Sequence, residues 1–265
     1  MAHLEQLYFA SIIAKNSRQI ISRGSILEVG SYAVNGSIRP FFESCTPVEY
    51  IGVDLVEGPC VDIVKSGHEL EYEDNHFDLA ISCECFEHNL YWAETFTNMI
   101  RMTKPGGIVA ISCASRGRVE HGTSRAENPG AAPGTSARGS EYYRNLGEKD
   151  FTESVPLNEH FVDYRFYYNH SHRDLFFVGL KKGADPNNTN LPLNQIYSEV
   201  RDIGSRCRRK KGVIKTVAKE VALNLPLGAL SRVLPEDTFQ NFAIPYWKLL
   251  KNLAGSRIDR WFKQN

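Results

Sequence analysis

Short apolar segments alternate with helix-length segments over the first 113 residues, and this alternation constrains the fold more than any other feature of the chain. Four segments have the composition of short buried strands: 25–30, 50–54, 77–82 and 107–112. Amphipathic spacing predicts a helix over 3–22, which ends before Gly24, and another helix over 92–103. Apolar strands that alternate with helices are typical of a parallel sheet with helices on both faces. We therefore expect an α/β fold with a doubly wound, mostly parallel sheet.

The pattern changes after Cys113. Residues 115–147 are rich in glycine, serine, arginine and proline, so we expect a long loop, and loops of this length are commonly functional. A helix is predicted from Glu148 onward. Two segments rich in strand-forming residues follow, 161–169 and 174–181, and the short gap between them predicts a terminal antiparallel hairpin.

The last third of the chain has a different character. Residues 183–194 have the composition of a linker. Residues 195–265 are predicted to be helical, with interruptions at Pro226, Pro235 and Pro245 because proline breaks a helix interior.

Two parts follow from these patterns: a domain over 1–183 with a substrate loop at 115–147, and a helical C-terminal extension over 184–265. The extension carries 14 basic against 7 acidic residues, whereas residues 1–183 carry 17 against 24. Its basic cluster, 206–211, leads into an amphipathic stretch, which suits peripheral contact with an anionic membrane. A phosphorylated carrier and packing against the domain are open alternatives. Nucleic acid is not expected, because aromatic residues do not interleave with the basic ones.

The composition, 42% hydrophobic and 23% charged, is that of an ordinary globular protein. The six cysteines do not suggest a disulfide framework, and Cys83-x-Cys85 lacks zinc-site spacing, so no metal site is expected. The first residues lack the features of a signal peptide, and no uncharged stretch reaches the ~20 residues of a spanning helix. We expect a cytoplasmic protein, with membrane contact limited to the inner face.

A glycine-containing turn follows the first predicted strand. Glu28-x-Gly30 ends that strand, and Gly36 follows six residues later. Glycine lets the backbone approach a ligand closely, and ligands bind at the carboxyl edge of such sheets. Asp54 ends the second strand, where a carboxylate suits a ribose diol, although an acid there also commonly caps a turn. Because G-x-G-x-x-G is absent, a nicotinamide-dependent oxidoreductase is disfavoured.

Four motifs occur in order along the chain: Glu28-x-Gly30 with Gly36, Asp54, Phe77-Asp78-Leu79, and Lys104-Pro105-Gly106-Gly107. In this order they resemble the class I S-adenosylmethionine-dependent methyltransferase superfamily, particularly its type 11 branch. The resemblance covers residues 25–113, and the predicted helix and hairpin at 148–182 agree with the end of that fold. It implies S-adenosyl-L-methionine as the cofactor and a Rossmann-like sheet.

The resemblance also implies which residues contact the cofactor. Glu28 would order the glycine turn and approach the methionine ammonium, and Asp54 with Leu55 would bind the ribose. Ser66 stands where the family commonly has an acid for the adenine amine; Asp62 is the candidate substitute, or else a solvated turn residue. The implied contacts are Glu28, Gly30, Ser31, Tyr32, Gly36, Asp54, Leu55, Asp62, Ser66, Gly67, His68, Ser82 and Cys83.

The acceptor end needs a proton acceptor if the nucleophile is a hydroxyl, and a neutral imidazole is suited to that role. His88 is the first candidate, with the alternative that it caps a helix or packs against neighbouring aromatic rings. His121, in the long loop, is the alternative base or a partner to His88. Glu84 and Glu87 are candidates to orient the imidazole or to contact the acceptor.

The long loop contributes further candidate acceptor contacts, Arg118, Tyr143 and Arg144. Arginines suit a phosphate, carboxylate or sulfate group, and a tyrosine ring suits a sugar. A solvated loop with ordinary charges is the alternative.

The sequence thus predicts methyl transfer to a small-molecule or glycan-like acceptor, anionic if the loop arginines bind it, by in-line displacement at oxygen with a histidine base. By resemblance, such chains with a helical tail belong to polysaccharide or natural-product biosynthesis. An N-methyltransferase, whose amine needs no strong base, and a non-catalytic S-adenosylmethionine-binding protein are the alternatives.

Overall fold

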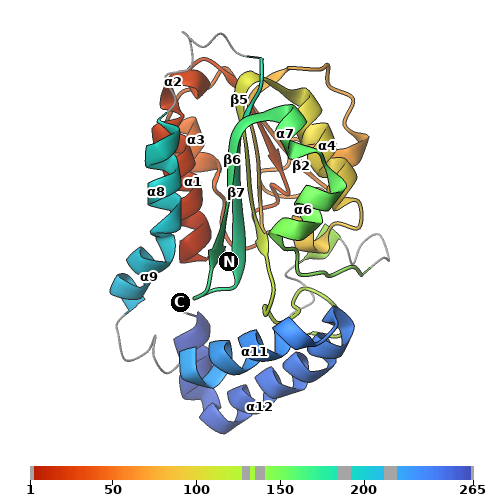
Figure 1. The fold of residues 1–265 in the computed structure, drawn as a ribbon, viewed down its shortest axis with the longest axis vertical. Helices are drawn as coiled ribbons and strands as arrows, with labels where there is room; N and C mark the ends of the chain where they lie inside the picture. Colours follow the sequence, from red (N-terminus) through yellow and green to blue (C-terminus); the bar gives the residue numbers. More distant parts are fainter. Residues whose placement is uncertain (1–2, 127–131, 135–140, 184–191, 212–219, 264–265) are drawn as a thin grey trace.

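The computed structural model describes residues 3–126, 132–134, 141–183, 192–211 and 220–263. Within these ranges seven strands form one sheet in the order β3-β2-β1-β4-β5-β7-β6 (Figure 1). The strands are β1 (Ser25–Val29), β2 (Glu49–Asp54), β3 (Ile63–Val64), β4 (Phe77–Cys83), β5 (Thr103–Ala114), β6 (Phe161–Asn169) and β7 (Asp174–Lys181). β7 runs antiparallel to β5 and to β6, and the other pairs are parallel. The doubly wound sheet and the terminal hairpin are confirmed.

Helices cover both faces of this sheet, as Figure 1 shows. One face carries α1 (Leu4–Asn16), α2 (Arg18–Ile21), α3 (Arg39–Glu43), α8 (Leu193–Arg201) and α9 (Ile203–Lys211). The other carries α4 (Trp92–Met102), α6 (Glu148–Ser154) and α7 (Leu157–His160). Two single turns, η1 (Gly67–Glu69) and η2 (Phe86–His88), lie in the connections of the sheet.

The central strands β1, β4 and β5 are buried on both faces, which is why their sequences are continuous apolar runs. Ile108 and Ala110 of β5 belong to the hydrophobic cluster under α1, whereas Val109 and Ile111 belong to the cluster under α4. Side chains of a strand alternate between its faces, so one apolar strand supplies two cores.

The helices α8 and α9 belong to the first of these cores. Ile196, Val200 and Ile203 are buried in the same cluster as Phe9 of α1. The first hydrophobic unit therefore continues past the boundary predicted at residue 183. Residues 184–191 of the predicted linker, and 127–131 and 135–140 of the predicted loop, lie outside the described residues.

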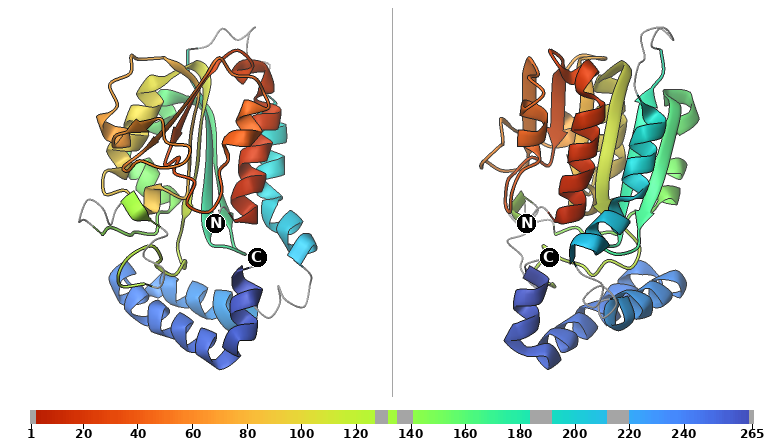
Figure 2. Two further views of the ribbon diagram at one scale, coloured as in Figure 1. Left: turned by 180° about the vertical axis from the view of Figure 1, so that it is seen from behind. Right: turned by 90° about the vertical axis from the view of Figure 1, so that its left-hand side faces the viewer.

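A second helical unit lies below the carboxyl ends of the strands (Figure 2). It consists of a π-helical turn, η4 (Glu220–Asn224), followed by α11 (Leu225–Val233) and α12 (Glu236–Lys263). Pro235 precedes α12, as expected of proline at a helix start. Pro226 is the second residue of α11, and because η4 leads directly into α11 the interruption predicted at Pro226 is only a change from π-helix to α-helix. The interruption predicted at Pro245 is wrong, because α12 continues through that residue. A helix can keep its course past one lost backbone hydrogen bond when neighbouring packing holds it.

The structure also describes the cysteines and the lengths of the helices. The structure describes all six cysteines, and none of them forms a disulfide bond. Among the described residues, no helix has the combination of length and apolar composition that crossing a membrane requires.

The burial of α8 yields a stability prediction. Ile196 is fully buried, whereas Val221 in the second helical unit is 60% exposed. We expect Ile196→Ala to lower the free energy of unfolding by about 3 kcal/mol, since it leaves a cavity in the main core. Val221→Ala, the matched control, should change it by less than about 0.5 kcal/mol. Urea unfolding of both variants measures this, and equal small effects would show that α8 is peripheral to folding.

Candidate active site

A pocket of about 240 Å³ opens at the carboxyl end of the sheet, beside the ends of β1, β2 and β4. The predicted site residues that line it are Glu28, Gly30, Ser31, Tyr32, Gly36, Asp54, Leu55, Ser66, Gly67, Cys83, Glu84, His88, Arg118 and His121. The predicted residues outside its lining are Asp62, His68, Ser82, Glu87, Tyr143 and Arg144. Residues far apart in sequence therefore converge on one cavity.

The turn after β1 is held against β2. The backbone N–H groups of Gly30 and Ser31 both donate to the carbonyl of Val53, at 2.8 and 3.1 Å. Gly30 has a φ of 81°, and a Cβ atom built on it would lie 2.4 Å from the Cβ of Cys85. Only glycine fits there, because both the backbone conformation and the close neighbour exclude a side chain.

Asp54 is fixed at the end of β2 by two backbone donors. Its Oδ2 accepts from the N–H of Tyr32 at 3.0 Å, and its Oδ1 accepts from the N–H of Leu55 at 2.7 Å. Burial raises the pKa of this carboxyl group, and the two N–H donors oppose the rise. Each carboxylate oxygen keeps lone-pair capacity toward the pocket, which is what binding a diol requires. Gly134 lies against this residue, with its Cβ position 3.2 Å from Oδ1.

Glu28 lies on β1 and is buried against β2. Its Oε2 accepts a hydrogen bond from the Tyr50 hydroxyl at 2.6 Å. Burial raises the pKa of Glu28 to about 8, because the ionised form loses solvation. A cation entering the pocket beside it would favour the carboxylate.

Asp62 does not face the pocket, so its predicted role as the adenine contact is not supported by its position. Its Oδ2 accepts from the backbone N–H of Gly52 at 2.7 Å and from the Arg39 guanidinium at 2.7 Å. These contacts join α3 to β2. Asp62 therefore has structural partners, and of the neighbouring residues Lys65, Ser66 and Gly67 line the pocket.

Two other predicted cofactor contacts also have structural partners. The His68 ring lies 4.2 Å from that of Tyr91, and its Nδ1 is 2.8 Å from Ser66 Oγ. The buried Ser82 hydroxyl donates to the carbonyl of Val29 at 2.8 Å. Neither His68 nor Ser82 lines the pocket.

His88 and His121 meet beside a buried carboxyl group. The two rings are 5.0 Å apart, centroid to centroid, and Tyr143 packs edge-on at 5.3 and 5.2 Å from them. Glu87, adjacent to His88 on η2, is fully buried. We call Glu87, His88 and His121 the imidazole–carboxyl cluster.

Burial favours the neutral form of every member of this cluster. It lowers the pKa of His88 to about 4 and holds the pKa of His121 well below its usual value, to which the nearby Arg118 charge adds. Burial also raises the pKa of Glu87 to about 8, with a further contribution from the charge of Glu84. At neutral pH both imidazoles are unprotonated and each has a nitrogen lone pair.

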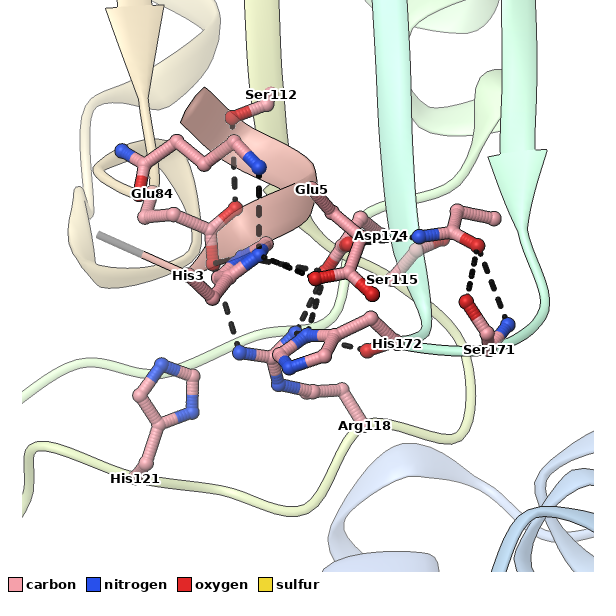
Figure 3. A network of polar contacts seen from close by, with 12 residues as sticks. His3, Glu5, Glu84, Ser112, Ser115, Arg118, His121, Ser171, His172 and Asp174 are labelled. Carbon is pink, nitrogen blue, oxygen red and sulfur yellow. Dashed lines mark hydrogen bonds and ion pairs between the residues drawn. The ribbon is translucent and has the colours of Figure 1, made fainter. Parts of the chain in front are cut away.

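A second group of side chains at this end is charged (Figure 3). His3 Nε2 lies 3.2 Å from a carboxylate oxygen of Glu84, and Arg118 lies 3.5 Å from the same oxygen. Arg118 also pairs with Asp174 at 2.5 Å, and His3 stacks on His172 at 4.0 Å. We call these five residues the His3–Glu84 network. Glu84 and Arg118 are thus held by opposite charges within the protein.

The charges of this network shift its own titrations. Burial opposes charging of His3, but Asp174 and Glu84 outweigh it and raise the pKa of His3 to about 10. Burial likewise opposes ionisation of Glu84, but the charges of His3 and Arg118 lower its pKa to about 2. At neutral pH both groups are charged.

Sequence reasoning did not find His3 as a pocket residue. His3 precedes α1. It reaches the site because the start of α1 lies at the edge of the sheet where β4 ends. A single histidine before an amphipathic helix carries no sequence signal for such a role.

The loop that carries Arg118 and His121 is fixed by the C-terminal helices. Gln240 of α12 accepts from the N–H of Glu120 at 2.9 Å and donates to the carbonyl of Arg118 at 2.9 Å. Val119 packs against the small hydrophobic cluster of the second helical unit, whose members include Phe239. The extension therefore holds in place the loop whose residues Arg118 and His121 line the pocket.

Tyr143 and Arg144 lie behind the pocket. The Tyr143 hydroxyl donates to Asn145 Oδ1 at 3.0 Å. The backbone N–H of Arg144 donates to the carbonyl of Glu87 at 2.9 Å, and its guanidinium pairs with Asp150. Both residues hold η2 in place, which differs from the direct acceptor contacts predicted for them.

The His3–Glu84 pair predicts a pH-dependent stability. The ion pairs that raise the pKa of His3 stabilise the fold. Their contribution is fully present below about pH 6.5 and is lost as the pH rises toward about 10. We expect the free energy of unfolding of the wild type, minus that of His3→Gln, to fall by a few kcal/mol between these values. Urea unfolding at several pH values measures it, with His160→Gln as the control outside the network. A pH-independent difference would contradict the pairing.

Of the comparisons with known proteins, the family match identifies the class of domain. A family model described as a methyltransferase domain matches residues 1–144. A search of curated proteins gives no match. The Burkholderia thailandensis 1,6-didemethyltoxoflavin-N1-methyltransferase structure, with S-adenosylhomocysteine bound, is 18% identical, with a TM-score of 0.46 over 66% of this chain and 79% of that one. An S-adenosylmethionine-dependent methyltransferase from Mesorhizobium loti is 13% identical, with a TM-score of 0.41 over 61% and 92%.

Similarity at these identities and TM-scores says nothing about the reaction of this chain. The family match is different, because it covers more than half of the 265 residues and includes every residue that lines the pocket. The chain belongs to the methyltransferase-domain family, as a class I S-adenosylmethionine-dependent methyltransferase.

Proposed function

We propose that this chain transfers the methyl group of S-adenosylmethionine to a hydroxyl oxygen of a small-molecule or glycan-like acceptor. The observation that carries the proposal is the pair of unprotonated imidazoles, His88 and His121, lining the same pocket as the Asp54 carboxylate. β1 lies between β2 and β4. The pocket therefore has a cofactor side, after β1 and β2, and an acceptor side, after β4 and β5.

The residues of the cofactor side fit an S-adenosyl group. Asp54 is oriented by two N–H donors and would accept from ribose hydroxyls. The buried Ser31 hydroxyl has no hydrogen-bond partner among the described residues, so it is available to the methionine portion. Glu28 would pair with the methionine ammonium, which would favour its ionised form.

When bound, S-adenosylmethionine supplies an electrophilic methyl group whose bonding electron pair stays with sulfur as the acceptor oxygen takes the carbon. The chain has to align the acceptor with that methyl group and exclude water. His88 or His121 would accept the hydroxyl proton on a ring nitrogen. Glu87 would orient His88 rather than touch the acceptor, since it lies outside the pocket lining.

The contacts of the arginines bear on the expectation of an anionic acceptor. Arg118 is paired with Glu84 and Asp174, and Arg144 with Asp150. These carboxylates offset the charge that would attract an anion. A neutral hydroxylated acceptor is therefore the better match to the described contacts. Membrane contact through the basic residues of α9, and a cytoplasmic location, stay predictions.

Cofactor binding is tested by substituting two aspartates, one that lines the pocket and one that does not. We expect wild-type protein to bind S-adenosylhomocysteine and Asp54→Ala to bind it at least tenfold more weakly, because hydrogen bonds to a charged group are worth about 1.5–3 kcal/mol. Asp62→Ala should leave affinity nearly unchanged, since its carboxylate contacts Arg39 outside the pocket. Isothermal calorimetry measures all three. No binding by the wild type would refute the cofactor assignment.

The imidazoles are tested by turnover. We expect His88→Asn, His121→Asn or both to lower kcat about 10²–10⁴-fold with a hydroxyl acceptor, because proton transfer assists that reaction. Release of S-adenosylhomocysteine with a panel of hydroxylated small molecules and glycans measures it, and His68→Asn is the control outside the pocket.

The same assay separates the alternatives. Full activity in both histidine variants would favour N-methylation, because an amine needs no strong base. Tight S-adenosylhomocysteine binding without turnover on any acceptor class would favour a non-catalytic binding protein.

A further inference from the structure

The imidazole–carboxyl cluster brings together three groups that ligate metals. One ligand atom from each of Glu87, His88 and His121 lies within 4.8 Å of the others. Glu87 and His88 are neighbours on η2, whereas His121 comes from the loop after β5. No spacing in the sequence indicates this set, because the third ligand is brought in by the tertiary fold.

The polar atoms of the cluster have few other partners. Glu87 is 0% exposed, and its two carboxylate oxygens make no well-formed hydrogen bond to the described residues, although the backbone at Ala114 lies close enough to lower the pKa of Glu87. The buried His88 Nδ1 likewise makes no well-formed hydrogen bond to the described residues. Buried polar groups are almost always paired, because an unpaired buried group loses its hydrogen bonds to water without replacement. Three such atoms in one cluster point to a bound partner.

His121 is oriented for the same purpose. Its Nδ1 lies 3.3 Å from the carbonyl oxygen of Val119. A proton on Nδ1 shared with that carbonyl leaves the lone pair on Nε2. A backbone carbonyl that fixes the tautomer of a histidine is the usual outer contact of a metal-binding imidazole.

The surrounding charge does not oppose a cation. Arg118 is the nearest positive group, and Glu84 and Asp174 pair with it. His3 is likewise offset by Glu5 and Glu84. The carboxyl groups of Glu5, Glu84 and Asp174 thus face the cationic side chains of His3 and Arg118.

We propose that Glu87, His88 and His121 bind one divalent transition-metal ion, of which Zn²⁺ is the expected example, at the acceptor side of the pocket. Two imidazoles and one carboxylate form the ligand set of open zinc sites and of related transition-metal sites. Mg²⁺ is disfavoured because it prefers oxygen ligands. His88 and His121 line the pocket, so the remaining coordination positions face the acceptor.

The ion binding itself does not depend on the proposed reaction, but its consequence for the acceptor rests on that proposal. A cation at this point would polarise an acceptor hydroxyl and lower its pKa. The acceptor would then be one whose oxygen coordinates the ion. His88 and His121 would act as metal ligands in place of acting as bases, and the hydroxyl proton, released at the lowered pKa, would pass to water at the pocket mouth.

A second group, His3, His172 and Asp174, also lies within 4.8 Å. Its members already contact each other and Arg118 in ion pairs and ring stacking. We therefore assign no metal to it, and it serves as the internal control.

The test is a metal titration of the full chain after chelator treatment. Co²⁺, which stands in for Zn²⁺ and has visible absorption bands, should bind with one ion per chain and be displaced by Zn²⁺. Glu87→Gln and His121→Asn should each weaken Co²⁺ binding at least tenfold, and His172→Asn should not change it. Elemental analysis of the purified wild type measures the native ion.

Calorimetry with S-adenosylhomocysteine on every variant keeps the two proposals separate. If the wild type binds S-adenosylhomocysteine but neither Co²⁺ nor Zn²⁺, the metal proposal is wrong and the methyltransferase proposal stands. If the wild type binds the ions but not S-adenosylhomocysteine, the metal proposal stands and the methyltransferase proposal is wrong. Metal binding that survives in Glu87→Gln and His121→Asn but is lost in His172→Asn would place the ion in the second group and overturn the assignment.

Discussion

The position of β1 between β2 and β4 is the constraint on which the site depends. The chain leaves β1 toward β2 on one side and later returns to β4 on the other, and all three strands run parallel. The connections after β1 and after β4 therefore diverge, and a crevice opens at the carboxyl edge. The backbone N–H of Gly30 donates to the carbonyl of Val53 and so holds the turn after β1 against β2, which leaves the crevice open on the cofactor side. Asp54 lies at one of these strand ends and Gly30 and Glu84 directly follow the other two, whereas His3, Arg118 and His121 reach the pocket from other elements.

Burial produces two different electrostatic states at the acceptor side, only a few residues apart. In the His3–Glu84 network, opposite charges lie close enough to outweigh the loss of solvation, so the groups stay ionised. In the imidazole–carboxyl cluster the charge of Glu84 acts on His88 and that of Arg118 acts on Glu87, but neither outweighs burial, so the neutral forms are favoured. Glu84 and Glu87 are close together in the sequence, yet their pKa values are about 2 and about 8. The arrangement of partners decides the charge of each group, more than the residue type does.

The C-terminal helices connect the acceptor side to the end of the chain. Gln240 binds the backbone on both sides of Val119, and the loop between β5 and α6 depends on that contact for its position. Arg173, at the hairpin between β6 and β7, donates to the carbonyl of Asn224. The sequence left three roles open for the extension: contact with a membrane, binding of a phosphorylated carrier, and packing against the domain. The contacts of Gln240 and Asn224 are of the third kind.

The sequence by itself determined the sheet and the cofactor side. Apolar strands, the Glu28-x-Gly30 turn and Asp54 are local features, because backbone conformation and strand ends are fixed by residues close together in the chain. The hairpin of β6 and β7 was predicted with its observed bounds for the same reason. Strand β3 was missed because two residues carry no periodic pattern.

Only the tertiary structure decided the acceptor side. His3 and Asp174 lie 171 positions apart and meet because α1 and β7 begin at the same edge of the sheet. Asp62 and Asp54 are similar in sequence context, yet Arg39 of α3 holds the first away from the pocket. His121 joins Glu87 and His88 through the fold of a loop held by α12. Contacts of this kind depend on packing between distant elements, and no local pattern of residues encodes them.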